Sequence, residues 1–411
     1  MKKFIAMLLM VSMMLTMIST AAFADDSAEI YMFINSPEYA DAVEELIAAY
    51  KEVAPNVTIN YETTQNDYPT LLKTKINAGE CPDIFATTSG KEIVSYLDYS
   101  YDFSAEAAAA AMTDPVKSVM MYGEEVHGFP IKGNYFGIIY NKAIFEEVGL
   151  EFPTTFSELE KACEAISAAG YTPFSTGFAE WWVYKHVMQH FVNAAGDSEA
   201  IVNSIVAGES TISDHPMIYD NFFNFIDLVV KYGDAKPLEC DLAGEEAAIG
   251  TGKAAMILGQ GAWVEDDILA IDDAFQLGFN GYPVSEDPAD CMIIAGSDQA
   301  LRINKDSAVL QDVLDFVNWW YTSDYGKAWF TNVAGVIPPV VDAAAPDKEV
   351  VKQGQVLEAE KGAGAVSIVY STDSFHEACG VILQSYIGGN VTKDEACAQI
   401  EAKWMDLDGT K

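Results

Sequence analysis

The feature that most constrains the fold is a regular alternation of strand and helix patterns over residues 29–88. Residues 29–34, 57–61 and 83–86 are short apolar or alternating runs, which are typical of β-strands. The stretches between them keep their apolar residues at helical spacing. A β-α-β-α-β order predicts a parallel sheet with helices on its faces, in which ligands bind beyond the carboxyl ends of the strands.

The segment 122–166 predicts that a second α/β unit follows the first. Gly123 is placed for a hairpin turn, and residues 136–140 form an apolar run typical of a buried strand. Thr155 or Ser157 can cap the helix that follows. A chain of 411 residues is also long enough for two domains, so pattern and length both predict two.

The order of several short motifs carries a further signal. These motifs are Tyr140-Asn141-Lys142, Gly149-Leu150, Pro153-Thr154-Thr155-Phe156, Gly252-Lys253-Ala254-Ala255-Met256 and Gly259-Gln260-Gly261-Ala262-Trp263. Their order resembles that of the family 1 extracellular solute-binding proteins of ABC importers, the maltose-binding-protein-like group, over residues 29–404. Phe156 stands where that family usually has Trp.

The resemblance implies an α/β fold of two lobes, the type II periplasmic-binding-protein fold. Each lobe would hold a mixed, mostly parallel sheet flanked by helices, and three hinge crossings would join the lobes near Asn134, Asn280 and Thr322. The N-terminal lobe would comprise residues 25–133 and 281–321. The C-terminal lobe would comprise residues 134–280 and 322–411.

Residues 1–24 have the layout of a secretory signal peptide. Lys2 and Lys3 precede an apolar run over residues 4–18, and Ala22-Phe23-Ala24 is a typical cleavage site. A membrane anchor is the alternative interpretation, but the short run and the small-residue ending favour cleavage. We therefore expect a secreted protein in the periplasm or at the cell surface that does not span the membrane after cleavage. No lipoprotein cysteine follows the apolar run.

The formal charge of −39 excludes two classes of partner. Neither nucleic-acid phosphates nor an anionic membrane surface would be neutralised by such a chain. A cationic ligand stays open, because Glu180 beside Trp181 and Trp182 is able to form a cation–π cage.

The cysteines and histidines predict neither a cofactor nor a metal site. The six cysteines are scattered and lack zinc-ligand spacing, so buried free thiols are expected, with Cys379 and Cys397 as the one pair considered for a disulfide. His186 and His190 are four residues apart, but no Glu or Cys accompanies them in a metal-binding pattern.

The aromatic residues favour a carbohydrate ligand. Sugars present apolar C–H faces and a rim of hydroxyls, which aromatic rings and polar side chains bind together. Trp181 and Trp263 lie at loop-to-helix junctions, and the glycines on either side of Gln260 are expected to let the backbone approach a ligand. Core packing is the alternative for each tryptophan.

The predicted function is capture of an oligosaccharide between two lobes and its delivery to ABC transporter permease subunits, by a monomer that is not an enzyme. A polyamine or other cationic solute is the second hypothesis, and a secreted glycosidase is the third. By resemblance, the binding residues would be Asn35, Asn66, Asp67, Thr88, Ser297 and Asp298 in the first lobe, Lys132 and Asn134 at the hinge, and Trp181, His186, Gln260 and Trp263 in the second lobe.

Overall fold

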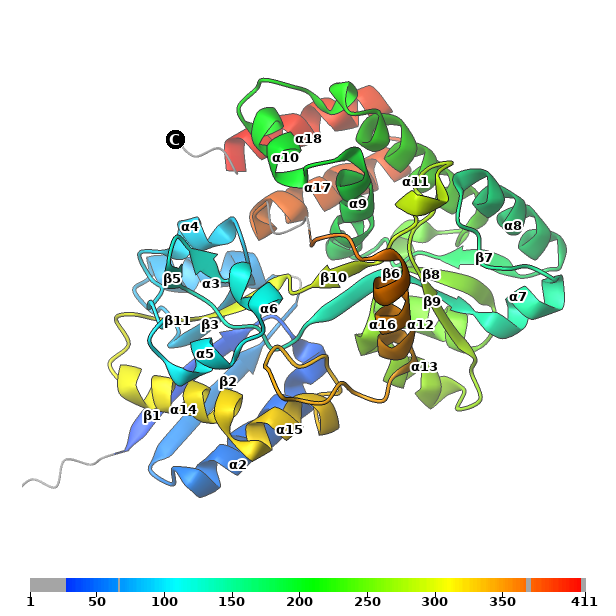
Figure 1. Ribbon diagram of the computed structural model, residues 1–411. Coiled ribbons are helices and arrows are strands. Elements are labelled where there is room, and N and C mark those ends of the chain that lie inside the picture. Colours follow the sequence, from blue (N-terminus) through cyan, green and yellow to red (C-terminus); the bar gives the residue numbers. More distant parts are fainter. Residues whose placement is uncertain (1–26, 66, 367–370, 408–411) are drawn as a thin grey trace, which may run out of the picture.

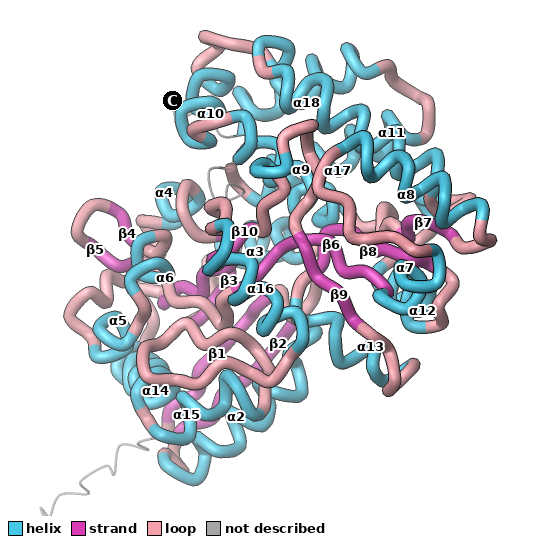
Figure 2. Tube along the Cα trace, turned by 45° about the vertical axis from the view of Figure 1, so that its right-hand side comes forward, coloured by secondary structure: helices cyan, strands magenta, loops and turns pink. Residues whose placement is uncertain are grey.

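The computed structural model describes residues 27–65, 67–366 and 371–407 (Figure 1). The predicted signal peptide, residues 1–24, lies outside the described residues. The chain forms two lobes, each built on its own sheet with helices on both sides of the strands (Figure 2). Within the described part of the chain, no helix is long and apolar enough to cross a membrane.

The sheet of the first lobe has the strand order β11-β3-β1-β2. β1, β2 and β3 run parallel, and β11 pairs antiparallel with β3. This arrangement confirms the β-α-β-α-β prediction. The strands are β1 Ala28–Ile34, β2 Val57–Thr63, β3 Ile84–Thr88 and β11 Gln299–Ile303, and the helices are α2 Ala40–Val53, α3 Tyr68–Asn77, α4 Glu92–Tyr96, α5 Ala107–Ala111, α6 Asp114–Ser118, α14 Leu310–Thr322 and α15 Asp324–Asn332.

A small hairpin extends the first lobe before the chain leaves it. Its strands are β4 Met121–Tyr122 and β5 Glu125–Val126. Gly123 has φ +63° in the turn between them, a backbone conformation that favours glycine. The hairpin predicted from this glycine is therefore present.

The sheet of the second lobe has the order β10-β6-β8-β7, with β9 also paired to β6. β6 runs antiparallel to β8, β9 and β10, and only β7 and β8 are parallel. The sheet is mixed, but the mostly parallel pairing that the resemblance implied is wrong for this lobe. The apolar run of residues 136–140 indicates that a strand is buried but not its direction. The strands are β6 Asn134–Asn141, β7 Thr172–Ser175, β8 Ala254–Gln260, β9 Leu277–Asn280 and β10 Ile294–Gly296.

Helices cover both faces of this second sheet (Figure 2). The Thr155 side chain caps α8 in a capping box with Glu158. Of the two predicted caps, Thr155 and Ser157, Thr155 is therefore the one used. The helices are α7 Lys142–Val148, α8 Phe156–Ala168, α9 Trp181–Ala195, α10 Ser198–Val206, α11 Phe223–Tyr232, α12 Leu242–Gly250, α13 Glu265–Ile271, α16 Glu349–Lys361, α17 Asp373–Ile387 and α18 Lys393–Leu407.

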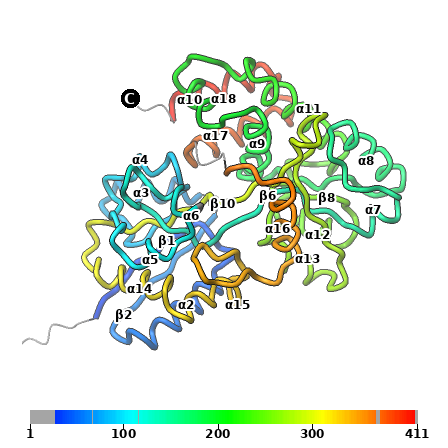
Figure 3. The backbone as a smooth tube through the Cα atoms, viewed as in Figure 1, coloured from blue at the N-terminus to red at the C-terminus, as the bar shows by residue number. Residues whose placement is uncertain are grey.

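Two of the three crossings lie later in the chain than the sequence predicts (Figure 3). The first leads into β6 at Asn134, but the second lies between β10 and β11, which belong to different sheets. The third lies between Val340, which packs in the first core, and Val350, which packs in the second. The expected crossings near Asn280 and Thr322 are therefore wrong.

Aromatic packing explains why the third crossing comes late. Trp329 and Phe330 of α15 pack against Trp320, and the Trp329 indole donates to the Ala42 carbonyl over 2.7 Å. These contacts keep α15 on the first core, so residues 322–340 belong to the first lobe. Residues 281–296 belong correspondingly to the second.

All six cysteines are free, and Cys163, Cys291, Cys379 and Cys397 are buried. The pair considered for a disulfide, Cys379 on α17 and Cys397 on α18, is not bonded.

Candidate functional site

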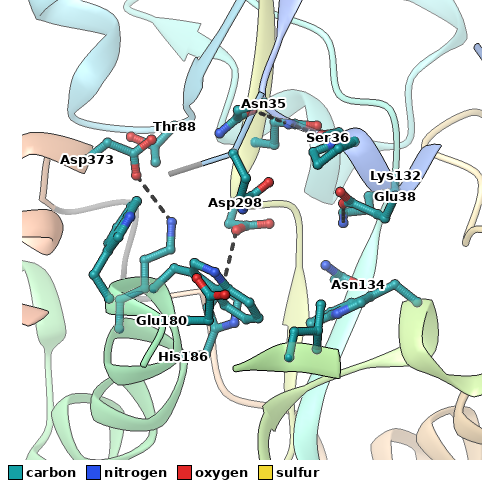
Figure 4. Close-up of a pocket in the computed structure, with 18 of the residues that line it drawn as sticks. Asn35, Ser36, Glu38, Thr88, Lys132, Asn134, Glu180, His186, Asp298 and Asp373 are labelled. Carbon is teal, nitrogen blue, oxygen red and sulfur yellow. Dashed lines mark hydrogen bonds and ion pairs between the residues drawn. The ribbon is translucent and has the colours of Figure 1, made fainter. Parts of the chain in front are cut away.

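A cavity of about 400 Å³ lies between the two lobes (Figure 4). Residues from strand ends of the first lobe form one wall, and the start of α9 and the loop after β8 form the other. We call this cavity the cleft. Its place beyond the carboxyl ends of β1 and β3 agrees with the rule for parallel sheets.

The first-lobe wall is held together by Gln299, the first residue of β11. Its amide donates to Asn35 Oδ1 over 2.7 Å and to Ser36 Oγ over 2.6 Å. Both acceptors directly follow β1, so one side chain joins the ends of two strands that are far apart in sequence. Gln299 was not among the predicted binding residues. Its only signal in the sequence is a polar residue at the start of an apolar strand.

Arg302 fixes the end of β3 from behind the wall. Its guanidinium is fully buried and donates to Thr87 Oγ1, the Thr88 carbonyl and the His127 carbonyl, over 2.7, 2.9 and 2.7 Å. Glu92 accepts from the backbone and hydroxyl of Thr88 over 2.7 and 2.6 Å. Burial lowers the pKa of Arg302 to about 10, against the effect of nearby Glu92. The threonines at the cleft edge are thus held rigidly.

Lys132 lies where the chain first crosses between the lobes. Its ammonium is 4.7 Å from the ring centroid of Tyr39 in the first lobe and 5.0 Å from that of Trp263 in the second. Glu38 Oε1 lies 3.4 Å away. Burial opposes the charge on Lys132, but Tyr39 and Glu38 raise its pKa above the ordinary value. Lys132 therefore forms a cation–π link between the lobes.

The start of α9 brings aromatic and charged side chains to the second wall. Trp181, Trp182, Lys185 and His186 all line the cleft. The Lys185 ammonium lies 3.2 Å from Asp373 Oδ1 and 5.4 Å from the centroid of Trp181. Lys185 and Asp373 were not predicted from the sequence, because 188 residues separate them and no local pattern relates them.

His186 and Asp298 face each other across the lobes as two acceptors. His186 Nδ1 lies 2.8 Å from the Gly259 carbonyl and donates to it. Burial lowers the pKa of His186, so the neutral ring leaves Nε2 as an acceptor. Nε2 is 3.8 Å from Asp298 Oδ2, which is longer than a hydrogen bond.

The charge on Asp298 is stabilised by its neighbours. Burial acts to raise the pKa of Asp298, but the charges of Lys185 and Lys132 hold this pKa well below its usual range. The carboxylate is therefore ionised at neutral pH and can accept hydrogen bonds from a ligand in the cleft.

We expect Asp298 to make stability fall in acid. Because its folded pKa is depressed, its contribution is fully present above the unfolded pKa of ~3.9 and is lost as the pH falls below that value. Asp298→Asn should remove on the order of 2 kcal/mol of this acid sensitivity, measured by denaturant unfolding at a series of pH values. Asp273→Asn, at an exposed position outside the cleft, is the control. Identical pH profiles for wild type and Asp298→Asn would contradict the assignment.

Several cleft residues carry buried polar atoms that have no protein partner among the described residues. They are the donors Trp181 Nε1 and Trp182 Nε1 and the acceptors Gln65 Oε1, His186 Nε2, Asp298 Oδ1 and Gln299 Oε1. Buried polar atoms are normally hydrogen-bonded. A ligand with both hydroxyl donors and oxygen acceptors would satisfy this set.

Most of the predicted binding residues line the cleft. They are Asn35, Thr88, Lys132, Asn134, Trp181, His186, Trp263 and Asp298. Asn66 lies outside the described residues. Asp67 precedes α3 at an exposed position and is not part of the wall.

Two predicted contact residues lie behind the wall. Ser297 is buried and donates to the Lys132 carbonyl over 2.8 Å. Gln260 is fully buried and bonds to Trp263 and Glu245. Their side chains are hydrogen-bonded within the protein, and neither residue lines the cleft.

The glycines beside Gln260 also differ from expectation. A Cβ on Gly261 would lie 2.4 Å from the Trp263 ring, and one on Gly259 would lie 2.8 Å from the Val183 side chain. These glycines admit protein side chains rather than a ligand. Within the described residues, no three His, Cys, Asp or Glu side chains are grouped as a metal would require.

Solved structures with known ligands share this two-lobe fold. A chitin oligosaccharide binding protein superposes with a TM-score of 0.81 at 18% identity, covering 94% of this chain and 100% of that one. The protein RafE in complex with raffinose superposes with a TM-score of 0.79 at 18% identity, covering 93% of this chain and 100% of that one.

Sequence comparison gives the family. The multiple sugar-binding protein of Streptococcus mutans is 22% identical over 355 residues, which are 82% of this chain and 84% of the relative. The melibiose/raffinose/stachyose-binding protein MelE of Bacillus subtilis is 24% identical over 160 residues, 38% and 37% of the two chains. The model of the bacterial extracellular solute-binding protein family matches residues 35–327. The chain therefore belongs to the bacterial extracellular solute-binding protein family.

Proposed function

We propose that the protein captures an oligosaccharide in the cleft and delivers it to the permease of an ABC importer. The observation that carries this proposal is the composition of the cleft. It combines the indole rings of Trp181, Trp182 and Trp263 with buried donors and acceptors that lack protein partners. Aromatic faces fit the C–H surfaces of sugar rings, and a rim of hydroxyls can donate to and accept from the polar atoms.

The named relatives support the same ligand class. The relatives in Streptococcus mutans and Bacillus subtilis are named for sugars, and the ligands named for two similar structures are chitin oligosaccharide and raffinose. All are named as binding proteins, so we propose that the bound sugar is not turned over. Export to the periplasm or cell surface and action as a monomer belong to the same proposal.

Contacts between the lobes support capture by closure. Lys73 of the first lobe donates to Ser374 of the second, and Asp298 faces His186 across the cleft. A ligand held by both walls binds the closed form better than an open one, so binding shifts the protein toward closure.

The structure favours a sugar over a polyamine. The cation–π position over Trp181, where the second hypothesis places a ligand cation, is occupied by the ammonium of Lys185. Lys132 occupies the corresponding position over Trp263. A ligand cation would have to displace these two ammonium groups from the rings, although the acidic side chains of Glu38, Glu180, Asp298 and Asp373 also line the cleft.

A thermal-shift screen with oligosaccharides and polyamines tests the proposal. We expect oligosaccharides to raise the melting temperature and polyamines to leave it unchanged. The affinity for the best sugar should hardly change with ionic strength, because a neutral ligand is not screened. Stabilisation by polyamines alone, lost at high salt, would contradict the proposal. Release of reducing ends from a bound sugar would identify a glycosidase instead.

A further inference from the structure

We infer that Glu245 and Gln260 are positioning residues that fix the orientation of the Trp263 indole in the cleft. Neither side chain lines the cleft, whereas Trp263 does. The inference rests on the proposed function, because it concerns how one wall of the proposed sugar site is held.

A continuous chain of hydrogen bonds leads from the cleft into the second lobe. Trp263 Nε1 donates to Gln260 Oε1 over 3.0 Å, and Gln260 Nε2 donates to Glu245 Oε2 over 2.7 Å. The backbone N–H of Leu258 donates to the other carboxyl oxygen, Oε1, over 2.9 Å. Gln260 and Glu245 are both 0% exposed, so water does not compete for these bonds.

Trp263 fixes the direction of donation along this series of hydrogen bonds. An indole N–H is a donor only, so Gln260 has to turn its carbonyl oxygen toward Trp263. Its NH₂ group is then left for Glu245. Because Leu258 donates from the other side, Glu245 has to accept on both oxygens. Burial raises the pKa of Glu245 well above its ordinary value, whereas these two donated hydrogen bonds lower it and favour the carboxylate, whose oxygens both accept. An amide has only one accepting oxygen.

Close packing leaves little room for another arrangement. A Cβ on Gly261 would lie 2.4 Å from the Trp263 ring, and a Cβ on Gly177 would lie 2.8 Å from Glu245 Oε2. On α12, Leu242 lines the cleft three residues before Glu245. The same helix therefore contributes to the cleft surface and supports Trp263 from behind. A platform fixed before the ligand arrives loses less freedom on binding.

The first test is Glu245→Gln, which keeps the size of the side chain. The new amide has only one oxygen, so its NH₂ group has to face either the Leu258 N–H or the Gln260 NH₂ group. One hydrogen bond of the series is therefore lost. An unpaired buried donor is costly, so the side chains rearrange and the Trp263 indole is no longer held in place. We expect sugar binding to weaken by ~10-fold as a result. Glu246→Gln, at the next position of α12, is the matched control, and its affinity should equal that of wild type.

A spectroscopic measurement reports on the indole directly and needs no sugar. The Trp263 indole N–H resonance, one of seven from the tryptophans, is assigned by its loss in Trp263→Phe. We expect it to move upfield and to exchange faster with solvent in Glu245→Gln, and to stay unchanged in Glu246→Gln.

The double variant Glu245→Gln/Gln260→Glu is the decisive test. It exchanges the amide and the carboxylate, so the hydrogen bond between positions 245 and 260 is donated in the opposite direction and the other two bonds are kept. The amide at position 245 accepts from Leu258 with its oxygen and donates to the carboxylate at position 260. That carboxylate accepts from Trp263. The double variant should regain most of the affinity and the wild-type indole resonance. A purely structural role for Glu245 predicts no such rescue.

The outcomes separate this inference from the proposed function. If wild type binds no oligosaccharide, the proposed function fails, and the ligand-free indole resonance still decides the positioning role. If sugar binds and Glu245→Gln changes neither affinity nor resonance, the inference is overturned alone. Should Glu245→Gln fail to fold, Gln260→Met and the double variant replace it. An unchanged resonance in Gln260→Met would overturn the inference.

Discussion

Replacing Trp263 with alanine is expected to weaken oligosaccharide binding roughly 30-fold or more. The ring is part of the cleft wall and lies against Lys132, Phe136 and His186. Truncation of a buried aromatic anchor often costs ~2–4 kcal/mol of binding free energy. The loss of the cation–π link to Lys132 adds to that cost.

The same substitution should also reduce stability. Trp263 packs against every one of the hydrophobic clusters described in the two lobes. Its removal should lower the free energy of unfolding by ~3–5 kcal/mol. Trp404→Ala is the control, because Trp404 is buried in the second lobe away from the cleft and should lose stability without losing affinity. Titration and melting of both variants check this. Unchanged affinity in Trp263→Ala with a large drop in melting temperature would show that Trp263 is structural only.

Replacing Arg302 with leucine is expected to lower the free energy of unfolding by ~3–5 kcal/mol. The substitution leaves the Thr88 and His127 carbonyls without their buried donor. It also removes the cation that faces Glu92, a buried carboxyl whose pKa is raised to about 7 by burial and by Asp373. Each unsatisfied buried group costs ~1–3 kcal/mol, so the effects together reach the upper range for a single substitution.

Denaturant unfolding measures this loss directly. Arg302→Lys is the matched control, because it keeps the charge and loses the planar set of donors, and it should be intermediate. An Arg302→Leu variant within ~0.5 kcal/mol of wild type would mean that the guanidinium is not needed to hold the strand end.

Local patterns in the sequence predicted the first lobe well. The spacing of apolar residues predicted the strands and helices of residues 28–88. The rule that ligands bind beyond the carboxyl ends of parallel strands predicted the place of the cleft, where Asn35 and Thr88 follow or end such strands. Such features depend on neighbours in the chain, so periodicity and turn residues are sufficient to predict them.

Features that depend on distant residues were missed. Asp373 reaches Lys185 only because α17 packs against α9, and Trp329 keeps α15 on the first core through Trp320. The antiparallel pairing of β6 likewise follows from the path of the chain between lobes. Gln260 was recognised from its motif, but its burial behind Trp263 depends on Glu245, which no local pattern connects to it.

A crystal structure with the oligosaccharide that gives the largest thermal shift would locate the ligand. We expect one sugar chain between the lobes, in contact with Trp263 and within hydrogen-bond distance of Asp298. A sugar bound on the outer surface of either lobe, with the cleft free of it, would show that the cleft is not the binding site.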